Sequence, residues 1–335
     1  MRRFITHIVL FLVLYMVVSG IYRSLLPKYW PNEMLELKLD YLEDHASQYN
    51  TVFLGSSKVY RHVDPALFDS LDPEGETSSF NLGTAGLFSP ESVVVLDHLI
   101  DQSEKYGIDR LFVQFQGISN LADKNLHAQR MKYPLSPGLM PSVFSTLKTE
   151  DKSDQMYNYF FSFLENMFSI GYFKDWYRGL NEVRKESRIG LDDLVIENDG
   201  FLSLDDELNY MVLQADKRGK GLLKRKATAT KKKKAKKIKK LNAEEHQVLN
   251  EIYQTMYHSL DKKAKNKGLE LFYFFMPEDF VKSESLDFDN ALLWELDEVG
   301  QFKSLTNKFD KGHYNEDGAQ LMTTLLANKY YSERN

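Results

Sequence analysis

Apolar residues along the chain form two patterns, and the first consists of short runs. Residues 51–54, 79–83, 110–115 and 269–276 are mainly apolar, and each run ends at or near glycine, proline or other turn-forming residues. Runs of this length bounded by turn signals are typical of buried β-strands. We therefore predict four strands, of which the first two end at loops rich in small polar residues.

The second pattern is helical periodicity in the longer segments between these runs. Apolar residues recur every three or four positions in residues 33–49, 90–106, 242–267 and 315–331. The expected inner face of the last segment consists of Leu321, Leu325 and Tyr330. The alternation of strands and helices predicts an α/β fold with a parallel central sheet, in which ligands bind at the carboxyl ends of the strands.

The N-terminus carries a membrane-targeting pattern. Arg2 and Arg3 precede an unbroken apolar run at 8–18, which extends with polar interruptions over 4–22. The shorter run has the length of a cleavable signal peptide, whereas the longer one can cross a bilayer core of about 30 Å. Because no Ala-x-Ala cleavage site follows, we expect an uncleaved anchor with the arginines inside the cell. A cleaved signal peptide and a buried core helix are the alternatives.

The middle of the chain predicts a helical insertion, because the strand pattern is lost between about 121 and 204. Its aromatic residues are Tyr157, Tyr159, Phe160, Phe161, Phe163, Phe168, Tyr172, Phe173, Trp176 and Tyr177. Aromatic stripes usually belong to the core, and a ligand groove is the alternative. We therefore divide the chain into an anchor (1–26), the first half of an α/β domain (27–120), a helical cap with a lysine-rich segment (121–241) and the second half of the α/β domain (242–335).

The composition is that of a folded domain without disulfides. The chain has 335 residues, 43% of them hydrophobic, and no cysteine. It can bury a large core, and the lack of cysteine excludes disulfides, thiolate catalysis and cysteine-ligated metal sites. No His-Glu-x-x-His motif or second ligand cluster occurs, so we expect neither a metal nor another cofactor.

Positive charge is concentrated in one segment. Residues 217–240 hold 14 of the 43 Lys and Arg and no acidic residue, although the net charge of the chain is −5. Such runs are typical of solvated, mobile insertions. The alternative is a patch that touches anionic lipid head groups or an acidic glycan. We do not expect nucleic acid as a partner, because the segment has no aromatic residue for base stacking.

Two stretches far apart in the sequence together supply a serine, an acid and a base. Gly55-Ser56-Ser57 follows the first predicted strand, and Asp310 and His313 lie just before the last helix. A hydroxyl becomes a good nucleophile when an imidazole takes its proton, and a carboxylate fixes the imidazole tautomer. This pattern favours a serine acyl-transfer site. An ordinary strand-to-helix turn and a helix cap beside a surface histidine are the alternatives.

The arrangement resembles the SGNH, or GDSL-type, hydrolase family, whose first block is a strand followed by Gly-Asp-Ser and whose last block is Asp-x-x-His. The resemblance covers less than half of the chain and implies a three-layer, flavodoxin-like fold. It makes Ser57 the nucleophile, His313 the base and Asp310 the residue that orients the base. Ser56 occupies the usual aspartate position, and we interpret it as a turn-capping hydroxyl.

In this family, two further blocks hold the oxyanion. Asn81 and Gly86 have the spacing of the second block, in which the glycine amide approaches the oxyanion, and a simple loop glycine is the alternative. The third block departs from the pattern, because Ile118 occupies the expected asparagine position. Asn120 and Gln116 are candidate replacements. The departure favours acyltransferases or non-hydrolytic partners over secreted esterases.

Two basic residues follow the serine closely. Arg61 and His62 are candidates for binding an anionic group of the substrate, and simple solvation is the alternative.

Together these features predict a membrane-anchored serine acyl-transfer enzyme of the bacterial cytoplasmic membrane, with its main domain in the periplasm or outside the cell. The favoured reaction transfers a small acyl group, with acetyl preferred, to or from an envelope polysaccharide. The resemblance implies a membrane-bound O-acyltransferase as a partner. The alternatives are a catalytically weak accessory protein that binds a glycan or an acyltransferase, and a tethered structural protein whose lysine-rich insertion grips an anionic surface.

Overall fold

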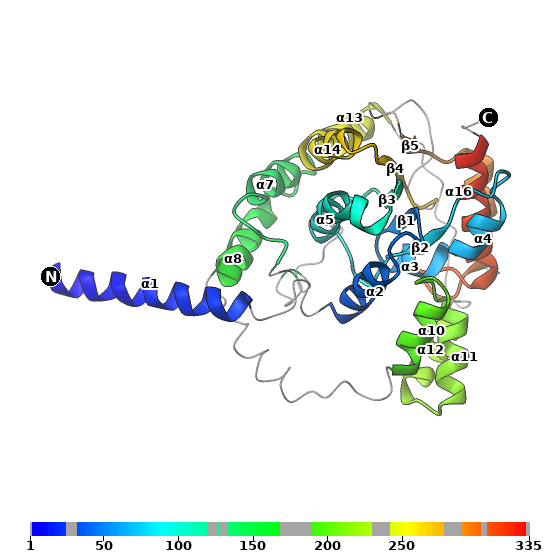
Figure 1. Cartoon of the computed structure of the whole chain (residues 1–335), viewed down its shortest axis with the longest axis horizontal. Coiled ribbons are helices and arrows are strands. Elements are labelled where there is room, and N and C mark those ends of the chain that lie inside the picture. Colours follow the sequence, from blue (N-terminus) through cyan, green and yellow to red (C-terminus); the bar gives the residue numbers. More distant parts are fainter. Residues whose placement is uncertain are drawn as a thin grey trace.

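A five-stranded, all-parallel β-sheet with helices on both faces forms the centre of the protein (Figure 1). The computed structural model describes residues 2–24, 32–118, 126, 131, 133–167, 189–229, 242–277, 288, 290–302 and 307–332. The predicted α/β fold with a parallel central sheet is therefore confirmed.

The sheet has the strand order β2-β1-β3-β4-β5. Its strands are β1 (Thr51–Leu54), β2 (Ser79–Asn81), β3 (Arg110–Gln114), β4 (Glu270–Phe274) and β5 (Ala291–Leu292). The first four lie within the predicted runs, whereas β5 is too short to show a strand pattern. Leu54 of β1 pairs with Val113 of β3, so the segments that follow these two strands meet at the same edge of the sheet.

Helices cover both faces of the sheet (Figure 1). On one face α5 (Glu91–Tyr106) contacts α2 (Glu33–Asp44) and α14 (His258–Asn266). On the other face α16 (Glu316–Ser332) packs against α3 (Ser57–His62) and α4 (Pro65–Ser70). The aromatic strand residues Phe53 and Phe112 are fully buried and stack at 5.0 Å between ring centroids. Burying a side chain of this size contributes about 1.5–3 kcal/mol.

The predicted helical segment at 242–267 is confirmed, with an irregular turn in its middle. It consists of α13 (Ala243–Ile252), a π-helical turn η5 (Tyr253–Tyr257) and α14. Asn242 and Glu245 form a capping box at its start. In the π turn, the Tyr257 hydroxyl donates to the Gln116 carbonyl at 2.9 Å. This bond ties the helix to the loop that follows β3.

The predicted helix at 33–49 is wrong in its C-terminal part. The helix α2 ends at Asp44. Ser47 adopts a positive φ of 70°, and its amide donates to the Tyr106 carbonyl at 2.9 Å. A left-handed residue cannot continue a right-handed helix, so this local conformation stops α2.

The predicted inner face of the last helix is confirmed for Tyr330 and only in part for Leu321 and Leu325, which pack against the core without being fully buried. Leu321 and Leu325 are only partly buried, whereas Met322 and Leu326 are fully buried and Tyr330 is buried as expected. The reason is a close approach at Gly318, where a Cβ atom would lie 2.4 Å from the Asn307 carbonyl oxygen. This contact turns the side of α16 that carries 318, 322 and 326 toward the protein.

The helical insertion predicted for 121–241 has two described parts that contact different regions. The first part comprises α7 (Met140–Thr149), η3 (Ser153–Gln155) and α8 (Met156–Met167), and α7 packs against α13 and η5. The second comprises α10 (Ile189–Glu197), α11 (Leu204–Leu213) and α12 (Lys217–Ala229). It encloses a small hydrophobic cluster of its own, which includes Tyr60 of α3 and Phe309.

The aromatic residues of α8 divide between core and surface. Tyr159 is 1% exposed, whereas Tyr157 is 68% exposed and Phe160 is 43% exposed. The interpretation of the aromatic stripe as core therefore holds for Tyr159 and for Phe163, which packs against the core, and is wrong for Tyr157, Phe160 and Phe161, which is 40% exposed. Phe168, Tyr172, Phe173, Trp176 and Tyr177 lie outside the described residues.

The lysine-rich segment is helical over its first half. Residues Lys217–Ala229 form α12, which packs against α11 and buries Leu222. The Lys and Arg side chains of α12 are exposed, as predicted for a solvated segment, whereas the mobility of the segment stays a prediction. Residues 230–241 lie outside the described residues. An apolar position at Leu222 among the lysines provides the contact that a purely solvated run would lack.

Two more helices complete the described elements. The short helix α15 (Leu296–Gln301) follows β5. The N-terminal helix α1 (Arg2–Ser24) projects from the body of the protein (Figure 1). Its residues Arg2–Ile21 have a mean hydropathy of 2.4 and only 6% of the hydrophobic window is buried. By length and composition α1 can cross a membrane, as the N-terminal pattern predicts.

Candidate active site

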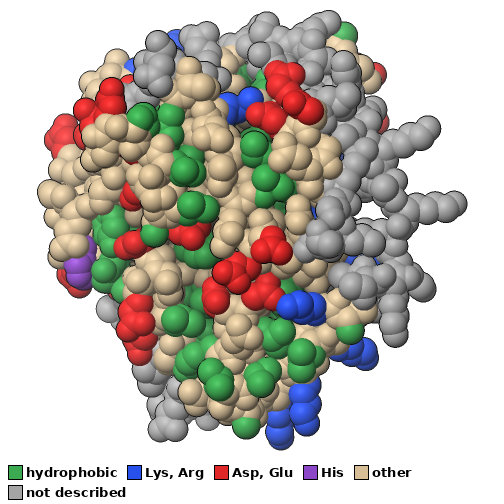
Figure 2. All heavy atoms as spheres, turned by 90° about the vertical axis from the view of Figure 1, so that its right-hand side faces the viewer, with side chains coloured by type: hydrophobic (Ala, Val, Ile, Leu, Met, Phe, Trp, Pro, Cys, Tyr) green, Lys and Arg blue, Asp and Glu red, His purple; other side chains and the backbone are tan. Residues whose placement is uncertain are grey.

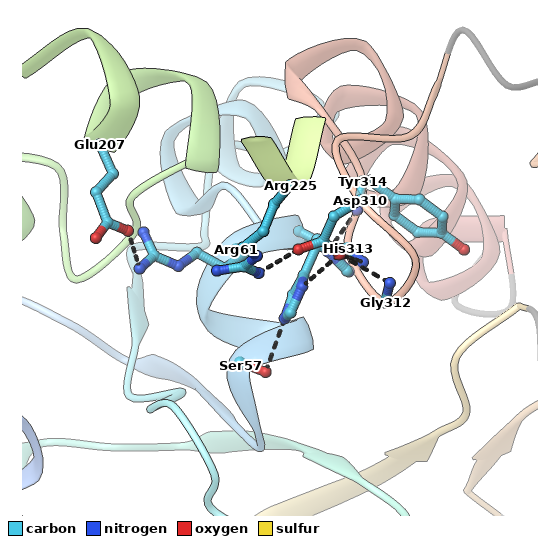
Figure 3. A network of polar contacts seen from close by, with 9 residues as sticks. Ser57, Arg61, Glu207, Arg225, Asp310, Gly312, His313 and Tyr314 are labelled. Atoms are coloured by element: carbon cyan, nitrogen blue, oxygen red, sulfur yellow. Dashed lines mark hydrogen bonds and ion pairs between the residues drawn. The ribbon is translucent and has the colours of Figure 1, made fainter. Parts of the chain in front are cut away.

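Ser57, His313 and Asp310 form a continuous hydrogen-bonded series (Figure 3). His313 Nε2 lies 3.0 Å from Ser57 Oγ, and His313 Nδ1 lies 3.0 Å from Asp310 Oδ1. The predicted juxtaposition of these three residues is therefore present. With the proton on Nδ1, the imidazole donates to the carboxylate and offers Nε2 as the acceptor for the serine hydroxyl proton.

The position of Ser57 follows from a tight turn after β1. The turn needs glycine at position 55, because a Cβ atom there would lie 2.3 Å from Val59 Cγ2 and 2.7 Å from Gln114 Cβ. Ser56 is the N-cap of α3, and its hydroxyl accepts from the Lys58 amide at 3.3 Å. The interpretation of Ser56 as a capping hydroxyl is confirmed. Ser57 is then the first helical residue and is only partly buried.

The neighbouring strand β3 fixes this turn through Gln114. The Gln114 Oε1 atom accepts hydrogen bonds from the Ser56 amide and from the Ser56 hydroxyl, both at 2.9 Å. Gln114 is 6% exposed, so its amide replaces the water that would otherwise bind these donors. The turn that carries Ser57 is therefore held from two strands.

The acid and the base lie on one short loop before α16. Asp310 Oδ1 accepts from the Gly312 amide at 2.8 Å and from the His313 amide at 3.0 Å. The Phe309 amide donates to the His313 carbonyl at 3.1 Å. The carboxylate thus closes the loop and braces the imidazole at the same time, which explains why the two residues are three positions apart.

The Asp310 carboxylate has a further partner that the sequence did not indicate. Arg225 of α12 donates to Asp310 Oδ2, the oxygen that His313 does not use (Figure 3). Burial alone would raise the pKa of Asp310, but hydrogen bonds from His313, Gly312 and Arg225 outweigh it and hold the pKa well below its usual range. Asp310 is therefore a carboxylate at neutral pH.

His62 binds the backbone of the loop that carries Asp310 and His313, and its side chain is too deeply buried to be solvated or to contact a substrate. It is 1% exposed, and its Nε2 accepts from the Tyr314 amide at 2.9 Å. Burial, with a smaller contribution from the charge of His313, lowers the pKa of His62 well below its ordinary value. His62 is thus a neutral ring whose centroid lies 5.8 Å from that of His313. Both interpretations made from the sequence are wrong for this residue.

Arg61 also has a structural role that the sequence did not predict. Its guanidinium pairs with Glu207 of α11, donates to the Leu202 carbonyl at 2.9 Å and covers the Tyr60 ring (Figure 3). The Arg61 side chain is 11% exposed. Its donors are therefore occupied by the insertion, and the prediction of substrate binding by Arg61 has no support in this geometry.

The side chain of Asn81 is hydrogen-bonded to backbone groups in and around α3. Its Nδ2 donates to the Val59 carbonyl at 2.8 Å and to the Val63 carbonyl at 2.6 Å, and its Oδ1 accepts from the Gly83 amide. Asn81 is fully buried. This asparagine therefore holds the serine-bearing helix against the end of β2, and its buried side chain is bonded to the backbone of the protein rather than free to hold an oxyanion.

The remaining oxyanion candidates are Gly86, Gln116 and Asn120. Gly86 has a positive φ of 74°, which favours glycine. Gln116 is 3% exposed, and its Oε1 accepts from the Ser89 amide at 3.3 Å. Its Nε2 is a buried donor without an acceptor among the described residues. Asn120 lies outside the described residues.

No family model, curated protein or solved structure matches the chain. The site is therefore interpreted from its own geometry. A carboxylate, an imidazole and a serine hydroxyl in hydrogen-bonded series can generate an oxygen nucleophile. Among the described residues, no group of three or more His, Asp or Glu side chains is arranged to hold a metal ion.

Proposed function

We propose that the protein is a membrane-anchored serine acyl-transfer enzyme of the SGNH type. The observation that carries this proposal is the 3.0 Å contact between His313 Nε2 and Ser57 Oγ, continued by the 3.0 Å contact to Asp310. The strand order β2-β1-β3-β4-β5 is that of flavodoxin-like folds. The serine lies just beyond the carboxyl end of β1, where ligands bind in such sheets.

The proposed reaction proceeds through an acyl-serine. Ser57 Oγ attacks the acyl carbonyl carbon while His313 Nε2 takes the hydroxyl proton, and His313 then gives that proton to the departing alcohol. An acceptor hydroxyl or water next attacks the acyl carbon while His313 Nε2 takes its proton. The bond between the acyl carbon and Ser57 Oγ then breaks, and His313 returns the proton to Ser57 Oγ. Asp310 keeps the imidazole in the required tautomer and stabilises its protonated form.

The developing oxyanion needs donors near Ser57. The amide of Ser57 opens α3 and therefore has no intrahelical acceptor. We assign this amide, the Gly86 amide and the unpaired Nε2 of Gln116 as the proposed donors. The Gln116 assignment is supported by its place two residues beyond β3, the strand that pairs with β1. Each such donor is worth about 3 kcal/mol in the transition state.

The proposed substrate is an acyl ester, with acetyl favoured, of a cell-envelope polysaccharide. The N-terminal helix α1, with Arg2 and Arg3 at its start, supports single-pass anchoring with the body outside the cytoplasm. A membrane-bound O-acyltransferase that delivers acyl groups across the bilayer is the proposed partner. A catalytically weak accessory protein would share the fold but would not need the hydrogen-bonded series.

Hydrolysis of p-nitrophenyl acetate by the full chain in detergent tests this proposal. We expect wild-type turnover to fall by at least about 10³-fold in Ser57→Ala and in His313→Gln. Ser70→Ala is the matched control, because Ser70 is an exposed serine whose hydroxyl only caps its own helix. Equal turnover in wild type and Ser57→Ala would contradict the proposal.

A further inference from the structure

The carboxylate of Asp310 divides its two oxygens between two elements. Oδ1 accepts from His313 and from two amides of its own loop, and Oδ2 accepts from Arg225 of α12. The Asp310 side chain is 10% exposed, whereas that of Arg225 is 48% exposed. Among the described residues, Arg225 is thus the side chain from outside the loop that holds the second oxygen.

A second residue of α12, Lys226, also connects this helix to the region around Asp310. Lys226 pairs with Asp205 Oδ1 at 2.5 Å, and Asp205 Oδ2 accepts from the Glu316 amide at the start of α16 at 3.0 Å. The Lys226 ammonium also lies 5.3 Å from the centroid of the Phe309 ring. Asp205 therefore links the basic helix to the helix that follows the acid and the base.

The insertion is fastened to the serine side of the site as well. Glu207 of α11 pairs with Arg61, which lies one helical turn after Ser57 on α3. Figure 3 shows the Arg61–Glu207 pair beside the hydrogen-bonded series and Arg225 directed at its Asp310 end. The α11 and α12 pair thus contacts both halves of the proposed active site.

We propose that Arg225 is a positioning residue for the acyl-transfer reaction, acting through Asp310. This inference rests on the proposed function. A carboxylate rotates readily about its terminal torsion, and an ion pair on Oδ2 keeps Oδ1 directed at the imidazole. Without Arg225, the loop amides would still hold Oδ1, but the carboxylate could turn its second oxygen toward His313 or solvent. The basic helix then belongs to the active site.

Steady-state kinetics of the full chain with p-nitrophenyl acetate test this role. Arg225→Gln should lower kcat about five- to ten-fold and leave KM unchanged, because a partly exposed ion pair makes a modest contribution and does not touch the substrate. Arg225→Lys should restore part of kcat, since it keeps the charge but not the planar fork. Arg218→Gln is the matched control on the same helix, where a 42% exposed guanidinium pairs with Asp216.

The outcomes separate the two claims. Unchanged kcat in Arg225→Gln, with an active wild type, would overturn the positioning role and leave the proposed function intact. The same loss in Arg225→Gln, Arg225→Lys and Arg218→Gln, together with lowered thermal unfolding midpoints, would also overturn it, since helix stability would then explain the loss. A wild type as inactive as Ser57→Ala would overturn both claims.

Discussion

The Nε2 atom of His313 lies 3.0 Å from the Oγ atom of Ser57, although the two residues are 256 positions apart. The contact exists because α16, which follows His313, packs directly against α3, which begins at Ser57. The spacing between these two helices therefore sets the distance over which the proton would pass. Changes that loosen this packing should reduce the reactivity of Ser57 without touching it.

Thr323→Val tests this dependence on helix packing. Thr323 Oγ1 accepts from the Asp64 amide at 2.9 Å and donates to carbonyl oxygens of His62 and Ala319. Valine has nearly the same shape but leaves the partly buried Asp64 amide without its acceptor, so the free energy of unfolding should fall by about 1–3 kcal/mol. Chemical denaturation measures this loss. No change in stability would contradict the role of Thr323 as a tie between α16 and α3.

Gly55→Ala should damage both stability and reactivity. The added methyl group would lie 2.3 Å from Val59 Cγ2, so the turn that carries Ser57 has to move. Overpacking of this kind costs about 1–3 kcal/mol. Gly138→Ala is a useful comparison, because Gly138 is an exposed glycine without a positive φ and with no atom within 4 Å of its Cβ position. Turnover by Gly55→Ala equal to that of wild type would show that the turn tolerates displacement.

His62 should make stability depend on pH in a defined window. Its pKa is depressed in the folded protein and is about 6.5 in the unfolded chain. The unfolded state therefore binds more protons below about pH 6.5, and stability falls there by about 1.4 kcal/mol per pH unit until the folded pKa is reached. Above about pH 6.5 His62 is neutral in both the folded and the unfolded state, so it no longer makes stability depend on pH.

His62→Gln isolates this effect, because a glutamine oxygen can still accept from the Tyr314 amide that His62 holds. The free energy of unfolding of the variant should depend less steeply on pH between 6.5 and 5 than that of wild type, by roughly the same 1.4 kcal/mol per unit. Denaturation curves at four pH values measure the slopes. Parallel slopes would mean that the ring is protonated without penalty in the folded protein.

Asp310→Asn should reduce kcat by a large factor and lower the free energy of unfolding only slightly. The asparagine keeps the size of the side chain but removes the charge that stabilises the protonated imidazole and can impose the wrong tautomer, for which a loss of about 10³–10⁴-fold is typical. Ser56→Ala is the contrasting variant, because it removes a cap of α3 worth about 1 kcal/mol without removing a member of the series. If both variants lost activity equally, Asp310 would have no special part in the chemistry.

The parts of the fold that the sequence predicted are those with strong local patterns. The strands β1 to β4 are continuous apolar runs, and α5 and α13 to α14 have clear helical periodicity with recognisable ends. The strand β5 has two residues and could not show a period. The most buried side of α16 could not be predicted fully, because the approach of Gly318 to Asn307, a tertiary contact, decides which positions are fully buried.

The candidate site was predictable only where neighbouring residues define it. Ser57, Asp310 and His313 follow short motifs, so their roles could be proposed from sequence. Arg225 could not, because one arginine within a basic run carries no local signal that it meets a carboxylate 85 positions away. The ion pair of Arg61 could not be predicted for the same reason, since its partner Glu207 lies in a separate helix.

Covalent labelling of Ser57 tests the central claim most directly. The full chain in detergent is treated with a fluorophosphonate, which reacts with serines activated by a neighbouring base, and the adduct is located by peptide mass spectrometry. We expect one adduct, on Ser57, that is lost in Ser57→Ala and formed at least about 10³-fold more slowly in His313→Gln. Labelling that misses Ser57, or that proceeds at the same rate in His313→Gln, would contradict the account.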